Sequence, residues 1–170
     1  MKEIQLTQGK MAIVDDEDFE WLNTFNWYVS SNGYARRDKM INYKRFRYSM
    51  HREIMGLTSD DRDLEVDHIN GNRLDNRREN LRVCTLKQNR QSQSKQKRNT
   101  TSKYKGVSFC KDRGNWKASI KTNGKTKFLG RFKDEDQAAR AYNEKAIELF
   151  GDFAKLNIIG GNKNENSIVS

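Results

Sequence analysis

A basic, polar stretch without apolar periodicity interrupts this chain and most constrains how it can fold. Residues 80–111 contain nine Lys or Arg and no acidic residue. The centre of this stretch, QSQSKQKRNTTSK at 91–103, has no helical or strand-like apolar repeat, which is typical of a linker. Only 34% of the 170 residues are hydrophobic, which argues against one thick core. We therefore predict two compact α+β units, 1–92 and 103–157, joined by a basic linker at 93–102.

The charge of the chain favours a polyanionic partner. It has 33 Lys and Arg against 23 Asp and Glu, a net charge of +10. Such a surface neutralises phosphates and releases counterions, so nucleic acid is the leading partner, although ribosomal and membrane-surface proteins share the bias. The two cysteines, Cys84 and Cys110, match neither a zinc pair nor a disulfide framework. No stretch resembles a signal peptide or a membrane span, so we expect a cytoplasmic protein with no membrane partner.

Two features stand out in the first 52 residues. Acidic residues at 15–18 are placed to cap a brief helix. Residues 36–52 hold seven Lys or Arg against one Asp and alternate with aromatic residues, which predicts a hairpin with one packed face and one basic face. The basic face is either solvated or in contact with phosphates. The aromatic and leucine side chains after the acidic cap are predicted to be core: Phe19, Trp21, Leu22 and Phe25.

The segment LEVDHINGNRLDNRRENLRVCTLKQNRQ at 64–91 combines chemically active side chains with a simple local structure. Two short apolar runs flank a Gly- and Asn-rich loop, and Thr85 with Gln88 forms a capping-box pattern, which predicts strand, loop, strand and helix. Asp67 and Asn89 offer oxygen ligands to one hard divalent cation. His68 beside the metal is suited to deprotonate an attacking water, which predicts phosphodiester hydrolysis. The alternatives are a turn capped by Asp67 and a surface amide at position 89.

At these residues the sequence resembles the HNH endonuclease family of phage-type homing enzymes, and the match includes LTQGKMAIVDDEDFEWL and YSMHREIMGL upstream, covering roughly residues 3–92. The resemblance implies a pair of strands and a helix that hold one metal ion, Mg or Mn. It implies that His68 is the general base, that Asn80 braces the loop, and that Asp67 and Asn89 are metal ligands. Asn89 stands where the family often has His. His51 is given a structural role, because it lies in the segment of alternating aromatics.

Residues 103–131 predict three short strands, with turns at 112–114 and at Asn123-Gly124, followed by a helix that Asp134 and Gln137 cap. Residues 103–131 carry nine Lys or Arg and one Asp, whereas residues 132–157 carry four against six acidic residues. The sheet is therefore the basic face, suited to the major groove of double-stranded DNA. The predicted apolar stripe of the helix is Ala138, Ala139, Tyr142, Ala146 and Leu149.

The motifs YKGVSF, NWKASI, FLGRF, AARAYNEKAIELFG and AKLN make this unit resemble the ethylene-response-factor or APETALA type DNA-binding domain. That family reads DNA with its sheet. Several family arginines are Lys, Ser or Thr here, which favours phosphate binding over base reading. Together with strand alternation, the resemblance predicts the DNA-binding residues Lys105, Ser108, Lys111, Arg113, Lys117, Lys121, Phe128 and Arg131. The alternative is a small domain with a solvated basic sheet.

Three functions fit these features to different degrees. A metal-dependent DNA endonuclease that hydrolyses phosphodiester bonds explains every segment. A catalytically silent DNA-binding regulator would keep both units without cutting, and an RNA-binding protein would explain the charge alone. By resemblance the enzyme leaves 5′-phosphate and 3′-hydroxyl ends and belongs to a phage homing or free-standing element. We expect no small-molecule substrate, a monomer that nicks one strand, and a loose tail at 158–170.

Overall fold

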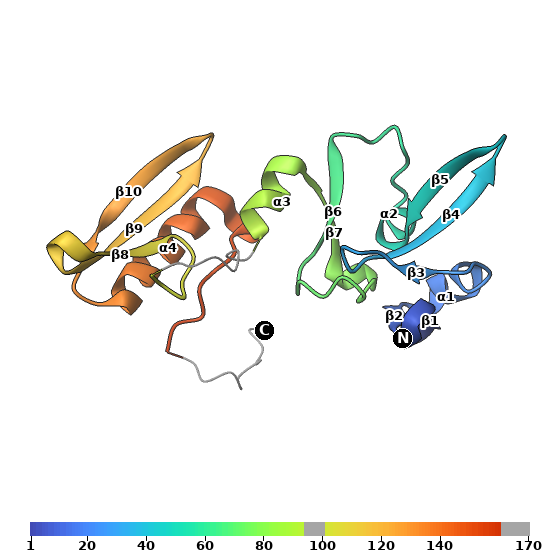
Figure 1. Cartoon of the computed structure of the whole chain (residues 1–170), viewed down its shortest axis with the longest axis horizontal. Coiled ribbons are helices and arrows are strands. Elements are labelled where there is room, and N and C mark those ends of the chain that lie inside the picture. The colour runs from blue at the N-terminus through green and yellow to red at the C-terminus, as the bar shows by residue number, and fades with distance from the viewer. Residues whose placement is uncertain (94–100, 161–170) are drawn as a thin grey trace. The chain divides into compact units, whose positions relative to one another are not determined.

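The computed structural model describes residues 1–93 and 101–160 (Figure 1). Its contacts divide the chain into two compact units, Met1–Asn89 and Arg90–Ser170. Within the described ranges the strands form four small antiparallel sheets, of which two have two strands and two have three strands. Most of the predicted linker and of the predicted tail, 94–100 and 161–170, lies outside the described residues. None of the helices in the described ranges combines the length and apolar character needed to cross a membrane.

The first unit begins with a hairpin and a short helix. Strands β1 (Lys2–Gln5) and β2 (Met11–Val14) pair antiparallel around the single turn η1 (Thr7–Gly9). Helix α1 (Asp16–Leu22) follows, with three acidic residues in its first turn, where they favour the helix dipole. Leu22 is fully buried and Phe19 packs against the core, as predicted. The prediction was wrong for Trp21 and Phe25, which stay exposed.

The second sheet of this unit has the order β3 (Tyr28–Val29), β4 (Ala35–Ile41), β5 (Lys44–Ser49). The predicted hairpin is confirmed, with the Cα pairs running from Arg36 with Ser49 to Ile41 with Lys44. Helix α2 (Met50–Ile54) follows β5 directly and buries Met50 and Ile54. The expectation of one packed face is wrong for the outer half of the hairpin, because every residue from 38 to 47 is exposed.

The remaining elements of the first unit carry the segment with the chemically active residues. Strands β6 (Leu64–His68) and β7 (Leu81–Thr85) pair antiparallel, and the turn η2 (Arg78–Asn80) precedes β7. Helix α3 (Leu86–Ser92) follows β7, and the boundary between the two units falls within it. The predicted capping box is present: the Gln88 backbone N donates to the Thr85 hydroxyl at 3.3 Å, and the Thr85 backbone N donates to Gln88 Oε1 at 2.9 Å.

The second unit is a three-stranded sheet with a helix. Strands β8 (Val107–Cys110), β9 (Asn115–Thr122) and β10 (Lys125–Phe132) are antiparallel with β9 in the middle, and η3 (Lys111–Arg113) joins β8 to β9. Asn123 and Gly124 have φ values of 50° and 76°, the left-handed pair that a tight hairpin turn requires. Helix α4 (Glu135–Phe150) is capped by Asp134, whose side chain accepts from the Gln137 backbone N at 3.0 Å.

The core of the second unit lies between the sheet and α4. Ala118 and Ile120 on β9 are buried against the helix, where Ala138, Ala139, Tyr142 and Ala146 form the predicted stripe. Leu149 was wrongly assigned to this stripe: it is exposed, and Phe150 is buried in its place. The short turn η4 (Gly151–Phe153) ends the helix.

The ends of the second unit are held together by side-chain amides. Asn157 accepts from the Lys105 backbone N at 2.6 Å and donates to the Lys105 carbonyl at 3.0 Å. Asn157 also exchanges two hydrogen bonds of 2.8 Å with Asn143 of α4. Ser102, placed at the end of the predicted linker, is buried and donates to Glu135 at 2.6 Å. Ordered packing in this unit therefore begins before position 103.

Candidate functional site

The loop that follows β6 is held by backbone hydrogen bonds to β2, near the N-terminus of the same unit. The backbone N of Ile13, on β2, donates to the Leu74 carbonyl at 2.8 Å, and the Asn76 backbone N donates to the Ile13 carbonyl at 2.7 Å. Through these two hydrogen bonds the loop pairs with the edge of β2, as a short additional strand would. They fix the backbone of a Gly- and Asn-rich segment that has little apolar surface of its own.

Asn80 closes the same loop through its buried amide. Its Oδ1 accepts from the Asn70 backbone N at 2.9 Å, and its Nδ2 donates to the Asp75 carbonyl at 2.7 Å. The Asn70 side chain in turn donates to Asp75 Oδ2 at 2.8 Å, and Arg77 donates to both oxygens of the Asp75 carboxylate. The bonds from Arg77 hold the pKa of Asp75 below its usual value. The loop is thus a closed network of hydrogen bonds with Asn80 at its centre.

His68 ends β6 and lies in a buried, mostly aromatic setting. Its residue exposure is 6%, and its Nε2 lies 3.3 Å from Oδ1 of Asn76, which is fully buried. An amide oxygen can only accept, so this contact selects the tautomer with the proton on Nε2 and leaves the Nδ1 lone pair to accept a proton. Burial lowers the pKa of His68, opposed by the Asn76 bond and by the charges of Asp67 and Asp75. The ring is therefore neutral near pH 7.

His51 of α2 packs directly against His68. Their ring centroids are 5.2 Å apart with a nearly perpendicular arrangement, and Tyr34 lies 5.0 Å from His51 and 5.8 Å from His68. His51 is only 7% exposed, and its Nδ1 has no hydrogen-bond partner among the described residues. Burial, and then the charges of His68 and two arginines, lower the pKa of His51 to about 3. No spacing in the sequence links Asn76, His51 and Tyr34 to His68, because the fold alone brings them together.

Acidic and amide side chains collect on the other face of β6. Glu65 and Asp67 alternate with Val66 and His68, so the two carboxylates share one face of β6 while His68 turns to the other, which differs from the expectation that His68 lies directly beside the metal. The Asn89 side-chain amide of α3 donates to Glu65. Arg82, the cross-strand neighbour of Asp67, donates to Asp67 Oδ2 from Nε at 3.1 Å and from a terminal nitrogen at 2.7 Å. Sequence reasoning missed Glu65, although its position two residues before Asp67 placed it on the same strand face.

Carboxylate and amide oxygens gather on this face, and Cys84, the cross-strand partner of Glu65, shares it. Among residues 1–93 and 101–160, no three His, Cys, Asp or Glu side chains converge as a metal cluster. Two carboxylates and one amide oxygen are nevertheless the donor types that a hard divalent cation prefers. The oxygen ligands on this face therefore fit a hard divalent cation, and Arg82 forms an ion pair with one of them, Asp67.

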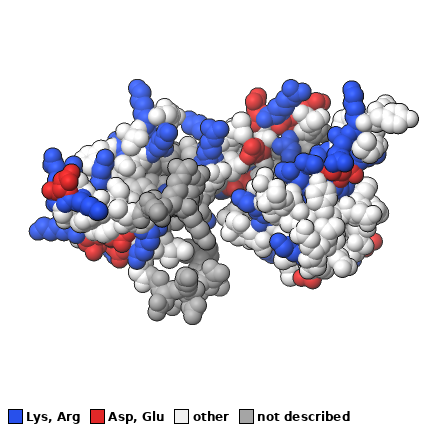
Figure 2. Space-filling view, viewed as in Figure 1, with Lys and Arg blue, Asp and Glu red and all other residues white. Residues whose placement is uncertain are grey.

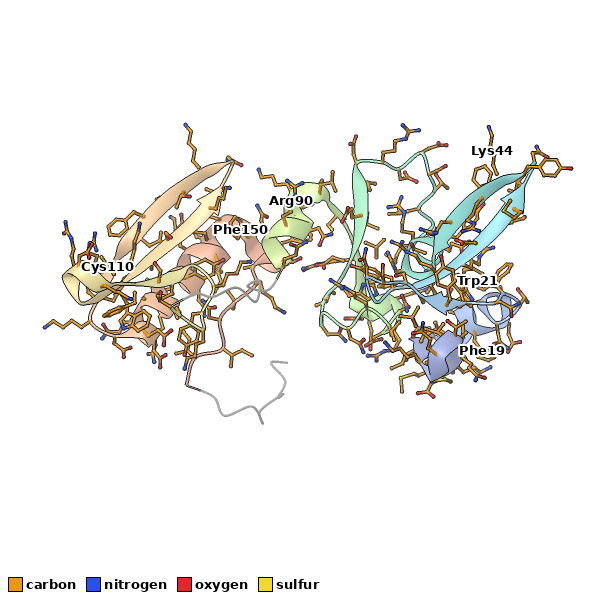
Figure 3. All side chains as sticks on the ribbon, in the orientation of Figure 1. Phe19, Trp21, Lys44, Arg90, Cys110 and Phe150 are labelled. Atoms are coloured by element: carbon orange, nitrogen blue, oxygen red, sulfur yellow. The ribbon has the colours of Figure 1, made fainter. Side chains whose placement is uncertain are left out.

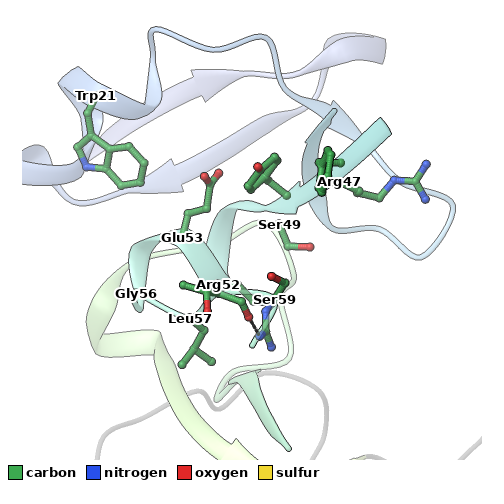
Figure 4. A pocket seen from close by; sticks show the side chains of 11 residues that line it. Trp21, Arg47, Ser49, Arg52, Glu53, Gly56, Leu57 and Ser59 are labelled. Atoms are coloured by element: carbon green, nitrogen blue, oxygen red, sulfur yellow. Dashed lines mark hydrogen bonds between the residues drawn. The ribbon is translucent and has the colours of Figure 1, made fainter. Parts of the chain in front are cut away.

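A separate hollow of about 550 Å³ lies elsewhere in the first unit (Figure 4). It is lined by residues of α1, β5, α2 and the following loop, among them Trp21, Tyr48 and Glu53. Arg52 also lines it and donates to the carbonyls of Leu64 and Thr58, both at 2.7 Å. None of the predicted catalytic or metal-binding residues lines this hollow.

Strand register sorts the predicted DNA-binding residues of the second unit. Ser108 and Arg131 are both Cα partners of Lys117, and Phe128 is the partner of Ser119. The same alternation that turns Ala118 and Ile120 toward α4 turns these residues, with Lys121, to the opposite face. Lys117 and Arg131 each lie within 6 Å of the Phe128 ring centroid, at 5.9 Å and 5.8 Å. Lys and Arg side chains project at several places on the visible surface of this unit (Figure 2).

The other three predicted residues lie off this face. Lys111 and Arg113 are exposed in η3, at the turn between β8 and β9. Lys105 is half-buried, and its ammonium donates to the carbonyls of Gln91 at 2.7 Å and Gln93 at 2.6 Å. Burial, and then the charge of Lys155, lower the pKa of Lys105 to about 8. The ammonium group of Lys105 is therefore engaged in hydrogen bonds within the chain.

Comparison with known proteins decides the family. Residues 60–91, which span β6 to α3, match the family model described as HNH endonuclease. An uncharacterized HNH endonuclease of Acanthamoeba polyphaga mimivirus is 35% identical over 155 residues, covering 89% of this chain and 77% of that protein. The chain belongs to the HNH endonuclease family. This HNH protein is also 32% identical to Protein 3.8 of Escherichia phage T7 over 91 residues, which is 54% of the chain and 74% of the phage protein.

The C-terminal stretch of the HNH chain has a second kind of relative. An AP2-like ethylene-responsive transcription factor of Arabidopsis thaliana is 37% identical over 68 residues, and APETALA2-like protein 2 of Oryza sativa is 40% identical over 60 residues. Each match covers 14% of the plant protein. No solved structure is significantly similar to the chain. The HNH protein therefore joins a nuclease-family segment to a stretch with AP2-like homology, and both imply contact with DNA.

Proposed function

We propose that this HNH protein is a metal-dependent DNA endonuclease that hydrolyses phosphodiester bonds in double-stranded DNA. The observation that carries the proposal is the setting of His68, whose Nε2 faces the Asn76 carbonyl oxygen while burial keeps the ring neutral. A neutral imidazole with a free Nδ1 lone pair can take the proton of an attacking water at neutral pH. His68 is the proposed general base.

Asp67 and Asn89 are the proposed metal ligands. We add Glu65, because it accepts a hydrogen bond from Asn89 and shares a face of β6 with Asp67. Bound there, one divalent cation, Mg or Mn, would stabilise negative charge on the phosphate and on the leaving oxygen. The ion pair between Arg82 and Asp67 orients the carboxylate on the strand. Asn80 holds the loop between the strands through its bonds to the Asn70 and Asp75 backbones, which is the proposed bracing role.

The sheet of the second unit is the proposed DNA-binding surface. Its outer face gathers Ser108, Lys117, Lys121, Phe128 and Arg131, and η3 adds Lys111 and Arg113 at one end. Lysine ammonium groups neutralise phosphates but lack the bidentate geometry with which arginine recognises bases. This surface therefore favours DNA binding through the phosphates over recognition of a base sequence. Lys105 is left out of the contact set, because its ammonium already donates to two backbone carbonyls.

The biological setting is proposed from resemblance. The phage T7 and mimivirus relatives support a viral homing or free-standing element acting in the cytoplasm of the host cell. One active site cuts one strand per visit, so a monomer should nick, leaving a 5′-phosphate and a 3′-hydroxyl. The silent-regulator function is the second candidate, and the Arg82 guanidinium on Asp67 favours it, because a cation at Asp67 has to compete with that charge.

A supercoiled-plasmid assay tests the nuclease function. Wild-type protein with Mg or Mn should convert supercoiled DNA to nicked circles, and EDTA should stop the conversion while DNA binding persists. Asp67→Asn and Asn89→Ala should raise the metal concentration needed for half-maximal cleavage, whereas Lys111→Gln should weaken DNA binding and leave that concentration unchanged. Binding without nicking on every DNA tested, phage genomic DNA included, would favour the silent regulator.

A further inference from the structure

The outer half of the β4–β5 hairpin is exposed on both faces, which folding alone does not explain. All ten residues from 38 to 47 are exposed, and four of them are large and apolar: Met40, Ile41, Tyr43 and Phe46. A two-stranded ribbon with no covered face gains little stability in water. These apolar side chains do not contribute to the core of the unit, so they point to a partner outside the chain.

The base of the hairpin is anchored where the exposed part begins. The Arg37 guanidinium donates to Glu53 at 2.9 Å and 2.6 Å and lies over the rings of Phe25, at 3.9 Å, and Tyr48, at 4.4 Å. Both partners of the Arg37–Glu53 pair are largely buried. This anchor holds the ribbon as it leaves the body of the unit (Figure 1).

The turn at the free end places an aromatic ring at the apex. Asn42 and Tyr43 both have positive φ, 48° and 61°, as in the tight turn whose second position favours glycine. Tyrosine is a poor choice for that backbone conformation, yet its side chain is fully exposed and contacts no core. Lys44, labelled in Figure 3, follows it at the same end. A strained and fully exposed tyrosine at the apex is the observation that needs a function.

The positive charge of the exposed hairpin segment favours DNA as its partner. The exposed segment has four basic residues, Lys39, Lys44, Arg45 and Arg47, against the single Asp38, which pairs with both arginines. Figure 2 shows Lys and Arg side chains around the β4–β5 hairpin and uncoloured atoms at its far end. A second copy of the chain would bring like charges together, whereas a duplex offers phosphates to the basic residues and stacked bases to the aromatic tip.

We propose that the tip of the β4–β5 hairpin is a DNA wedge, in which Tyr43 inserts between stacked bases while the flanking Lys and Arg bind the adjacent phosphates. The inference rests on the proposed function only in taking the substrate to be duplex DNA. Insertion of a side chain unstacks a base step and kinks the duplex, so DNA that is already unstacked is bound more tightly. The wedge gives the protein a preference for deformable DNA.

Binding in EDTA tests the wedge without requiring cleavage. Fluorescence anisotropy compares an intact 30-base-pair duplex with one that carries a central abasic site, at the same salt concentration. Wild type should bind the abasic duplex about tenfold more tightly, because the unstacking cost is removed. Tyr43→Phe should keep this ratio. Tyr43→Gly should abolish it, and it cannot fail by misfolding the turn, since glycine prefers the backbone conformation that Tyr43 adopts.

A charge variant separates the wedge from simple attraction. Lys44→Gln should weaken binding to both duplexes equally and lower the salt slope by about one unit, with the abasic preference intact. The signal of 2-aminopurine next to the abasic site should change with wild type and Tyr43→Phe but not with Tyr43→Gly. An unchanged abasic preference in Tyr43→Gly, or no preference in wild type, would overturn the wedge and leave the nuclease proposal standing. Altered self-association of Tyr43→Gly with unchanged DNA binding would point instead to a second copy.

Discussion

His51 should make the first unit sensitive to acid. Its pKa is about 3 in the folded chain, against an ordinary value of 6.5. Because the folded pKa lies below the unfolded one, the unfolded chain binds the extra proton as the pH falls. The free energy of unfolding is therefore unaffected above about pH 6.5 and decreases down to about pH 3. The two pKa values give a loss from His51 of about 2 kcal/mol at pH 5 and about 3 kcal/mol at pH 4.

Urea denaturation at pH 8 and pH 5 measures this loss. Trp21 and Trp27 lie in the first unit and Trp116 in the second, so a Trp116→Phe background lets fluorescence report the first unit alone. His51→Gln removes the titrating group, and its stability should fall about 2 kcal/mol less than that of the parent between the two pH values. Equal losses in parent and variant would show that His51 is not the source of the acid sensitivity.

The remaining predictions concern the second unit and the proposed general base, His68. Gly106 has φ 76°, and a Cβ there would meet a ring carbon of Tyr142 at 2.1 Å, so Gly106→Ala should cost about 3 kcal/mol in thermal or urea unfolding. Gly114→Ala, with φ 59° and open space, should cost only about 1 kcal/mol, and equal costs would argue against the close approach. The lowered pKa of His68 predicts that the acid limb of the cleavage rate lies below pH 6.5. Asn76→Leu should reduce kcat about tenfold or more with DNA binding unchanged, whereas Asn76→Asp should retain cleavage and move the limb to higher pH; a kcat of Asn76→Leu equal to wild type would rule out its positioning of His68.

Local signals in the sequence predicted local structure well. Thr85 with Gln88 and Asp134 with Gln137 form the expected caps, because each pairs a side chain with a backbone group three residues away. The Asn-Gly turn and the strands around it follow from the same short-range rules. The exposure of Trp21 was not predictable in this way. A helical repeat shows which side chains share a face of the helix, but it does not show whether another element packs on that face.

The surroundings of His68 could not be derived from the sequence. His51 comes from α2 and Tyr34 from the chain before β4, and only the fold places both rings beside β6. Asn76 lies in a segment of similar polar residues, and its contact with His68 depends on the bonds that fasten the loop to Ile13. The alternation of β6 did contain one usable signal, since it puts Glu65 on the face of Asp67.

The single-turnover rate of plasmid nicking by His68→Ala tests the proposed role of His68 as the general base. With protein in excess and Mn present, we expect a rate about a hundredfold or more below wild type, with DNA affinity unchanged, because the proposed proton acceptor is lost while the binding surfaces remain. Nicking by His68→Ala within a few-fold of wild type would show that His68 is not the general base.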